Sequence, residues 1–235
     1  MKTLIIVPAY NEESTIKEVV SQLNGVNSNW DILVINDGSQ DRTSEIVASL
    51  KEVELIDLPI NLGIGGGVQT GFLYAKRRGY DRAIQFDGDG QHIATEIPQL
   101  LAPLEEGLAD VVIGSRFLEH KGFQSTFLRR IGIKIFERVN SLLIHQKITD
   151  NTSGFRAYNR RALSFLSQYY PTDYPEPEAV ILLAKNGFDL VEVPTLMNER
   201  QGGVSSISGF GALYYMVKVL LAIFITSIRR RVVSS

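Results

Sequence analysis

Two carboxylates one residue apart are the side chains of this sequence best suited to chemistry. Asp87 and Asp89 lie in the segment Asp87-Gly88-Asp89-Gly90-Gln91-His92, directly after the mostly apolar run 83–86. Mg²⁺ and Mn²⁺ favour carboxylate oxygens, and Mg²⁺ usually takes one or two of them while substrate phosphates fill other positions. The glycines leave room for a ligand to approach the backbone. The spacing therefore favours a turn that binds a divalent cation together with a diphosphate.

Other kinds of turn also contain Asp-x-Asp. A calcium-binding EF-hand loop would need Gly at its sixth position and Glu at its twelfth, where this sequence has His92 and Pro98. The sequence therefore excludes an EF-hand. A solvated acidic turn remains an alternative for the motif taken alone, so the neighbouring motifs have to decide between them.

The composition favours a single cytoplasmic domain. With 235 residues, of which 44% are hydrophobic and 21% charged, the chain can bury one sizeable core. The formal charge of -2 gives no overall attraction to nucleic acid. The sequence has no cysteine, which excludes disulfides and thiolate metal sites. The short run 4–7 before Pro8 is unlike a signal peptide, so we expect the bulk of the protein in the cytoplasm.

Short β-branched runs alternate with helical patterns in the first half of the chain. This alternation predicts an α/β fold in which helices cover both faces of a mostly parallel sheet. Ligands of such sheets bind beyond the carboxyl ends of the strands. Strands are expected at 3–7, 31–35, 53–58, 83–86 and 111–114, and helices at 12–23, 42–50, 66–78 and 96–104.

Four consecutive predicted strands end in polar or glycine-rich turns. Each turn alone fits an ordinary turn or a helix cap, but four at one sheet edge favour a ligand site. The glycine-rich turn lacks a dinucleotide-binding fingerprint, because Val68 replaces the third glycine, and no Walker A lysine is present. The turns are 8–13, 36–43, 61–67 and 87–92.

Six motifs follow one another along the chain: Pro8-Ala9-Tyr10-Asn11-Glu12, Asn36-Asp37-Gly38-Ser39 with Asp41 and Thr43, Asn61-x-Gly63, Asp87 to His92, Gly114-Ser115-Arg116 and Ser153-Gly154-Phe155-Arg156. This ordered set resembles family 2 glycosyltransferases, and among them the dolichol-phosphate mannose synthases and their bacterial polyprenyl-phosphate relatives. Together the motifs are far more specific than Asp-x-Asp alone. The resemblance covers residues 2–206. It implies a GT-A (Rossmann-like, three-layer) catalytic domain at 1–206, followed at 207–235 by an apolar C-terminal helix with a basic end.

The resemblance also implies roles for individual residues. Asp87, Asp89 and Arg116 are implied to be catalytic, and Asp89 and Gln91 to hold Mg²⁺ or Mn²⁺. Two departures from the family pattern occur: Gly88 replaces the commoner alanine, which we expect to be harmless, and Ile64 stands where many relatives have a basic residue. The implied nucleotide-sugar residues are Pro8, Ala9, Tyr10, Glu12, Asp37, Gly63, Asp87, Gly88 and Asp89, and those for the acceptor phosphate are Arg116, Arg129 or Arg130, and Arg200.

A basic segment follows Arg116. Residues 116–147 contain seven basic and two acidic side chains, and apolar residues recur at helical spacing in about 125–145. This pattern predicts a basic amphipathic helix, either at an anionic membrane surface or packed on the core. Residues 209–228 carry a single charge, Lys218, and precede Arg229-Arg230-Arg231. A central lysine disfavours a simple membrane span, so we expect a helix that lies in the interface or packs in an oligomer, with a buried core helix as the alternative.

The function expected from these features is transfer of a hexose from a nucleotide-diphosphate sugar to a polyprenyl phosphate at the cytoplasmic membrane surface. The donors that fit are GDP-mannose, UDP-glucose and UDP-N-acetylglucosamine. Family resemblance implies inversion at the anomeric carbon. A phosphate acceptor needs no strong base, whereas a hydroxyl acceptor, as in cell-wall or surface polysaccharide synthesis, would need a carboxylate such as Asp150, Glu176 or Glu178. The two glutamates also suit a helix start.

Two functions of other classes use similar motifs. A nucleotidyltransferase would have a basic loop near the N-terminus, whereas Tyr10-Asn11-Glu12-Glu13 is acidic. A non-catalytic sugar-nucleotide-binding protein would not need to keep Asp87, Asp89 and Gln91. Both alternatives are therefore less favoured than the transferase.

Overall fold

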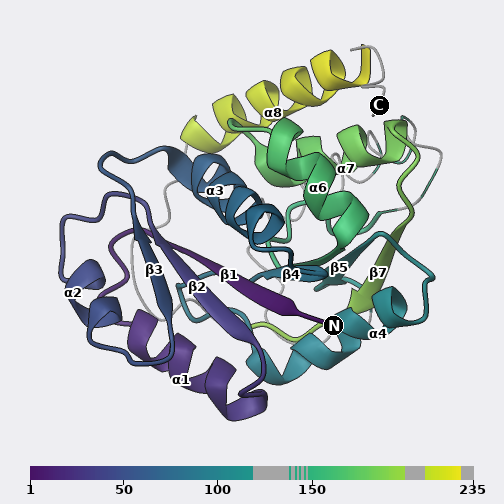
Figure 1. The fold of residues 1–235 in the computed structure, drawn as a ribbon. Helices are drawn as coiled ribbons and strands as arrows, with labels where there is room; N and C mark the ends of the chain where they lie inside the picture. Colours follow the sequence, from purple (N-terminus) through teal and green to yellow (C-terminus); the bar gives the residue numbers. More distant parts are fainter. Residues whose placement is uncertain are drawn as a thin grey trace.

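The computed structural model describes residues 1–118, 138, 141, 143, 146, 148–198 and 210–228. Among these residues, one sheet of seven strands forms the centre of the fold, in the order β3-β2-β1-β4-β6-β5-β7 (Figure 1). All neighbouring strands are parallel except at β6, which is antiparallel to both β4 and β5. The strands are β1 (Thr3–Ala9), β2 (Asp31–Asn36), β3 (Glu54–Asp57), β4 (Arg82–Gln85), β5 (Val111–Ser115), β6 (Arg156–Asn159) and β7 (Leu190–Pro194).

Helices cover both faces of this sheet (Figure 1). Side chains alternate along β1, so that Leu4 and Ile6 pack with α3, α6 and α7, whereas Ile5 and Val7 pack on the opposite face with α1 and α4. Because both faces are buried, β1 reads as a continuous apolar run. The helices are α1 (Ile16–Val26), α2 (Thr43–Ala48), α3 (Gly63–Arg77), α4 (Ile97–Glu105, after a 3₁₀ turn at Ala94–Glu96), α6 (Arg160–Tyr169), α7 (Pro175–Lys185) and α8 (Phe210–Ile228).

The predicted α/β fold class is confirmed, and each predicted strand and helix of the first half is present within a few residues. The largest shift is at α1, which begins at Ile16 and not at residue 12. There the backbone N–H groups of Thr15 and Ile16 bond to the carbonyl of Glu12 and make a turn before the helix. The helix predicted at about 125–145 falls almost entirely outside the described residues.

The reversed direction of β6 was not predicted, and it decides which residues share the functional edge. Gln85 at the end of β4 pairs with Arg156 at the start of β6, and Ile113 of β5 pairs with the same residue. The segment that precedes β6 therefore lies at the edge where the parallel strands end. This places residues 149–155 beside the Asp87 turn.

Within the described part of the chain, no helix is both long enough and apolar enough to cross a membrane.

We predict that replacing Gly71 destabilises the fold, because α3 packs closely on β1 at this residue. A Cβ at Gly71 would overlap the side chain of Ile6, which is fully buried and has no room to move. Overpacking of this kind costs about 1–3 kcal/mol, so Gly71→Ala should lower the free energy of unfolding by that amount in urea titrations.

Gly25→Ala in α1 is the matched control, because a Cβ there meets nothing within 4 Å. It should leave stability unchanged or raise it by up to about 1 kcal/mol through helix propensity. Equal unfolding midpoints for the two variants would contradict the packing argument.

Candidate active site

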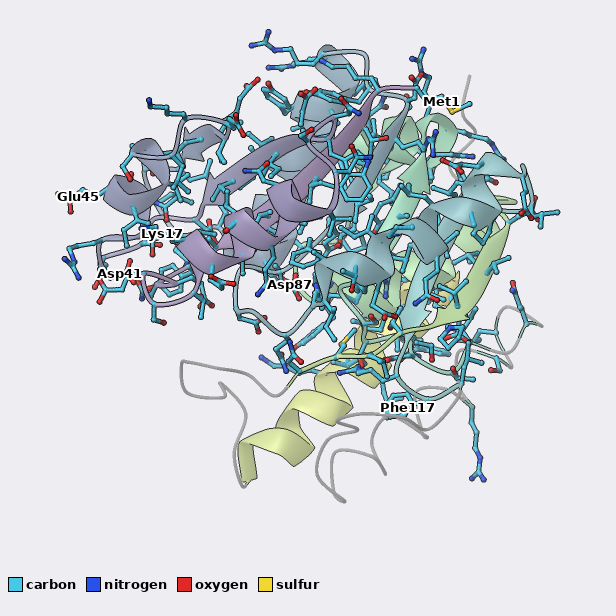
Figure 2. All side chains as sticks on the ribbon, turned by 90° about the horizontal axis from the view of Figure 1, so that it is seen from below. Met1, Lys17, Asp41, Glu45, Asp87 and Phe117 are labelled. Atoms are coloured by element: carbon cyan, nitrogen blue, oxygen red, sulfur yellow. The ribbon has the colours of Figure 1, made fainter. Side chains whose placement is uncertain are left out.

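The Asp87 turn is closed by two hydrogen bonds that its own side chains accept. The backbone N–H of Asp87 donates to Nδ1 of His92 (3.0 Å), and the N–H of Gln91 donates to Oδ1 of Asp89 (3.0 Å). Gly90 has a positive φ of 76°, which suits glycine. The turn thus holds both carboxylates at the sheet edge. In Figure 2, Asp87 lies near the centre of the molecule, between Asp41 and Phe117.

His92 is a buried, neutral ring that contacts the backbone and the side chain of Asp87. Burial lowers the pKa of His92 to about 4, an effect that outweighs the attraction of Asp89. Since Nδ1 accepts a hydrogen bond, the proton of the neutral ring is on Nε2, which lies 3.6 Å from Oδ2 of Asp87. The ring stacks on Phe155 with centroids 4.8 Å apart. This role of His92 was not predicted, although its place in the motif Asp87 to His92 was the available signal.

The turns after β1 and β2 are tied together by side chains of the second motif. Asn11 has a positive φ of 56°; its N–H donates to Oγ of Ser39, and its side-chain oxygen accepts from the N–H of Gln40 (both 2.9 Å). The N–H of Glu12 donates to Oγ1 of Thr43 (2.9 Å). These bonds give the Asn36 to Thr43 motif a structural purpose, since it fixes the loop that carries Tyr10 and Glu12.

Two acidic residues predicted to bind the nucleotide are buried in these loops. Oδ1 of Asp37 accepts from the N–H of Leu62 (2.7 Å) and so anchors the glycine-rich turn that begins α3. The hydroxyl of Thr15 donates to the carbonyl of Gly88 (2.8 Å), and its Oγ1 also lies 3.1 Å from Oε2 of Glu12. The structure therefore connects the first, second, third and fourth turns. The remaining residues predicted for the nucleotide sugar lie at the ends of the adjoining elements: Pro8 and Ala9 end β1, Tyr10 follows it, and Gly63 begins α3.

Arg116 follows β5 and forms a bidentate ion pair with Asp150. Its Nε lies 2.6 Å from Oδ2 and its Nη2 lies 2.7 Å from Oδ1 of a fully buried carboxylate. Burial lowers the pKa of Arg116, but Asp150 and then Asp87 raise it above its ordinary value. Both oxygens of Asp150 already accept hydrogen bonds, so this geometry leaves it poorly placed to act as a base.

The loop before β6 packs directly against the Asp87 carboxylate. A Cβ on Gly154 would lie 2.8 Å from Oδ2 of Asp87, so only glycine fits without a shift. Arg156 is fully buried, and it donates to the carbonyls of Ser153 (2.7 Å), Asn151 (2.9 Å) and Glu176 (3.0 Å). The guanidinium therefore clamps this loop in place. The motif was noticed in the sequence, but these roles require the pairing of β4 with β6.

The two glutamates of α7 occupy the first turn of the helix, as the helix-start interpretation predicted. Glu178 accepts from the N–H of Tyr174 (3.2 Å) and from Oγ1 of Thr226 in α8 (2.9 Å). Burial raises the pKa of Glu176, Arg156 lowers it, and Asp87 raises it further. Glu178 thus bonds to α8, whereas the pKa of Glu176 responds to the charges of Arg156 and Asp87.

The segment that follows β7 reaches the Asp87 turn. Met197 forms an isolated antiparallel bridge with His92, and the N–H of Asn198 donates to the carbonyl of Gln91 (2.9 Å). Three predicted acceptor residues, Arg129, Arg130 and Arg200, lie outside the described residues. Arg200 is two residues beyond Asn198 in the sequence.

The donor set of the turn suits a hard cation that is shared with a phosphate ligand. Asp89 and Gln91 supply a carboxylate and an amide oxygen, and Asp87 adds a second carboxylate. Within the described ranges, no group of three or more His, Cys, Asp or Glu side chains could hold a metal ion. A cation at this turn would therefore need further ligands from a bound phosphate.

Comparison with known proteins gives the family. The sequence pattern of glycosyl transferase family 2 matches residues 4–166. The UDP-N-acetylglucosamine--dolichyl-phosphate N-acetylglucosaminyltransferase of Methanococcus voltae is 33% identical, over 91% of this chain and 94% of its own. The polyprenol monophosphomannose synthase of Mycolicibacterium smegmatis is 32% identical, over 93% of this chain and 85% of its own.

A solved structure shows the same fold. The glucosyl-3-phosphoglycerate synthase of Mycobacterium tuberculosis, in complex with Mn²⁺, UDP and phosphoglyceric acid, superposes with a TM-score of 0.70 at 17% identity. The match covers 97% of this chain and 79% of that one. From the family match and the similarity to both relatives, the chain belongs to glycosyl transferase family 2.

Proposed function

We propose that this glycosyltransferase moves a hexose from a nucleotide-diphosphate sugar to a polyprenyl phosphate, with inversion at the anomeric carbon. The observation that carries the proposal is that an Asp-x-Asp turn and the cation Arg116 lie next to each other at one edge of the sheet. Both relatives described above are named for prenyl-linked products or acceptors, and both match nearly the whole chain. The donor is of the GDP-mannose, UDP-glucose or UDP-N-acetylglucosamine type.

The donor binds across the first four turns. Tyr10, Glu12 and Asp37, with Pro8 and Ala9, bind the base and ribose, on loops that are tied to each other before any ligand arrives. Gly63 and Gly88 keep the backbone accessible near the diphosphate. Such preformed loops lose little conformational entropy when the donor binds.

Asp89 and Gln91 hold Mg²⁺ or Mn²⁺, with Asp87 beside them. Such a metal would neutralise the negative charge that develops on the departing nucleoside diphosphate. The chain's own task is to hold the two carboxylates at a fixed separation and orientation. Gly154, His92 and the backbone of Gln91 do this in the described structure.

The acceptor phosphate approaches from the Arg116 side. A phosphate monoester is already anionic near neutral pH and attacks without a strong general base. The carboxylates near this side agree with such a reaction, because Asp150 is paired with Arg116 and Glu178 bonds to α8. Arg116, Arg129 or Arg130, and Arg200 bind the phosphate oxygens.

A hydroxyl acceptor is the second candidate, and a single observation favours it. Burial raises the pKa of Glu176, Arg156 lowers it and the Asp87 carboxylate raises it further, and a raised pKa is the direction that suits a carboxylate acting as a general base. A hydroxyl acceptor would need such a base. A phosphate acceptor would leave Glu176 with a supporting role.

We further propose that residues 1–206 form the catalytic domain and that 207–235 form an appended helix with a basic end. A lipid acceptor requires the protein to work at a membrane, which fits a peripheral enzyme at the cytoplasmic face. The N-terminal location of all four donor turns agrees with this division.

We predict that Asp89→Ala abolishes transfer while the fold stays intact. Loss of a group that stabilises transition-state charge typically costs about 100-fold or more in turnover. Metal-dependent transfer from each nucleotide sugar is the measurement, and the thermal midpoint reports the fold. Glu52→Ala, at an exposed turn, is the control. Wild-type turnover in Asp89→Ala would refute the metal role.

We predict that Gly154→Ala impairs catalysis through Asp87. The added methyl group would push the carboxylate from its position, and a displacement of about 1 Å near reacting groups can cost about 100-fold in rate. Turnover should fall and the metal concentration for half-maximal activity should rise, whereas Gly25→Ala changes neither. Unchanged metal dependence would show that Asp87 tolerates the methyl group.

We predict that Arg200→Ala mainly weakens the acceptor. A charge-assisted hydrogen bond contributes about 1.5–3 kcal/mol, so the acceptor KM should rise by roughly 10- to 100-fold while the donor KM stays the same. Arg77→Ala at the exposed end of α3 is the control. If acceptor KM and turnover are both unaffected, Arg200 does not bind the phosphate.

A further inference from the structure

Helix α8 has two chemically different faces in its second half. Val219, Ile223 and Thr226 are buried. On the other side, four large apolar side chains are exposed at helical spacing, and we call them the outer face. They are Leu221 (57% exposed), Phe224 (57%), Ile225 (41%) and Ile228 (66%). Residues spaced by three, four and seven positions share one side of a helix, so the outer face is continuous.

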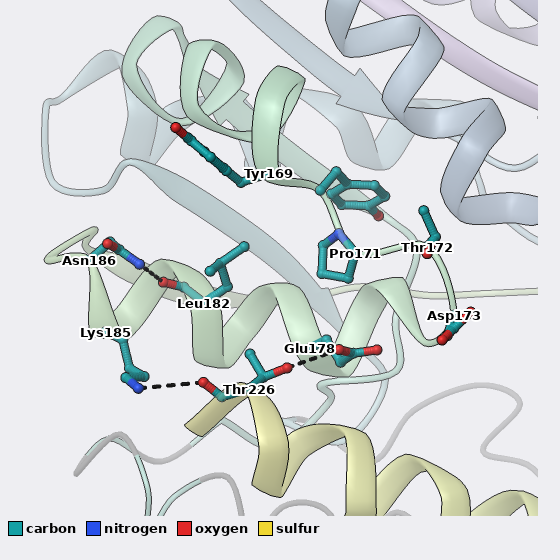
Figure 3. Close-up of a pocket in the computed structure, with 10 residues that line it drawn as sticks. Tyr169, Pro171, Thr172, Asp173, Glu178, Leu182, Lys185, Asn186 and Thr226 are labelled. Carbon is teal, nitrogen blue, oxygen red and sulfur yellow. Dashed lines mark hydrogen bonds between the residues drawn. The ribbon is translucent and has the colours of Figure 1, made fainter. Parts of the chain in front are cut away.

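The inner face of α8 is fixed to α7 by specific contacts. Val219 and Ile223 pack on Ile181, and Oγ1 of Thr226 donates to Oε2 of Glu178 (2.9 Å). Lys185 donates to the carbonyls of Thr226 (3.4 Å) and Ser227, in the last turn of α8 (Figure 3). A cation at the carboxyl end of a helix satisfies carbonyls that lack helical partners and complements the helix dipole.

These bonds define which face of α8 points outward. Turning the helix about its axis would break the Thr226 bond and expose Val219 and Ile223, so the outer face cannot be buried against α7. A cavity of about 310 Å³ lies on the inner side, between the end of α6, α7 and Thr226. Figure 1 shows α8 outside the layer of α3, α6 and α7, far from the sheet.

The charges that accompany the outer face identify its partner. Lys218 is exposed one turn before Leu221, and Arg229-Arg230-Arg231 follows the helix directly in the sequence. Residues 218–235 contain no acidic side chain. Apolar side chains on one side of a helix that also carries basic residues suit an anionic lipid surface, where each basic residue contributes about 1 kcal/mol.

A second copy of the chain is a poorer match for this surface. A stable protein interface takes about 20–30 residues from each side, and the described outer face offers four large apolar residues. A bilayer needs no shape complementarity, and its anionic headgroups attract the basic residues.

We propose that the outer face of α8 binds the surface of an anionic bilayer, with Leu221, Phe224, Ile225 and Ile228 inserted at the headgroup boundary. The binding itself is independent of the reaction. Its consequence for catalysis rests on the proposed polyprenyl-phosphate acceptor, which α8 would bring within reach by holding the enzyme at the lipid surface.

Sedimentation with vesicles tests the surface. Wild-type protein should bind vesicles of phosphatidylglycerol and phosphatidylcholine, and pure phosphatidylcholine should bind it less. Phe224→Glu should weaken binding to the anionic vesicles by at least tenfold. The control is Leu108→Glu, which puts the same charge on another exposed leucine (63% exposed) after α4 and should bind like the wild type.

Two outcomes would overturn the proposal. One is equal vesicle binding by wild type and Phe224→Glu, or none by wild type. The other is a wild-type dimer in light scattering that Phe224→Glu converts to a monomer, without vesicle binding by either. Thermal midpoints of both variants near that of the wild type establish that folding is intact.

Activity assays separate this surface from the proposed reaction. With a short, water-soluble prenyl phosphate, Phe224→Glu should keep wild-type turnover, whereas with a long-chain acceptor in anionic vesicles it should lose at least tenfold. Equal loss on both acceptors would overturn the role of the outer face in presenting the lipid. If the wild type uses neither acceptor but binds vesicles in a way that Phe224→Glu weakens, the proposed function is wrong and the proposed membrane-binding role of the outer face is supported.

Discussion

The close contact between the Asp87 carboxylate and the backbone of Gly154 is the constraint on which the site depends. The contact exists because β6 is antiparallel to β4 and β5, so that the loop before β6 lies at the carboxyl ends of the parallel strands. The contact leaves no room for a side chain at Gly154. The position of the first carboxylate is therefore set by pairing in the sheet, and not only by the turn that carries it.

A buried cation keeps that loop rigid. Removing a charge from water is costly, and Arg156 offsets the cost with three carbonyl acceptors and with the carboxyl group of Glu176 nearby. Arg116 is held by Asp150 and remains a cation beside Asp87, whereas burial keeps His92 uncharged. The turn therefore has a fixed positive charge on its Arg116 side, where the acceptor phosphate is proposed to bind.

Local patterns predicted most of the parallel part of this fold. The buried runs at β1 and β2 and the turns that follow them are encoded by neighbouring residues, so their place at one edge followed from strand order alone. The direction of β6 could not be predicted, because its four residues acquire direction only from partners distant in sequence. The same holds for Asp150, which pairs with Arg116 across 34 positions, and for the support that His92 and Gly154 give to Asp87. The predicted roles of Arg129, Arg130 and Arg200 stay predictions.

The chemical identity of the attacking atom tests the central claim most directly. The enzyme would be given each nucleotide sugar with Mn²⁺ and a soluble prenyl phosphate or the matching prenyl alcohol, and the products would be examined by mass spectrometry and NMR. We expect sugar on the phosphate oxygen alone, with the anomeric configuration opposite to that of the donor. Transfer to the alcohol, or retention of configuration, would contradict this account.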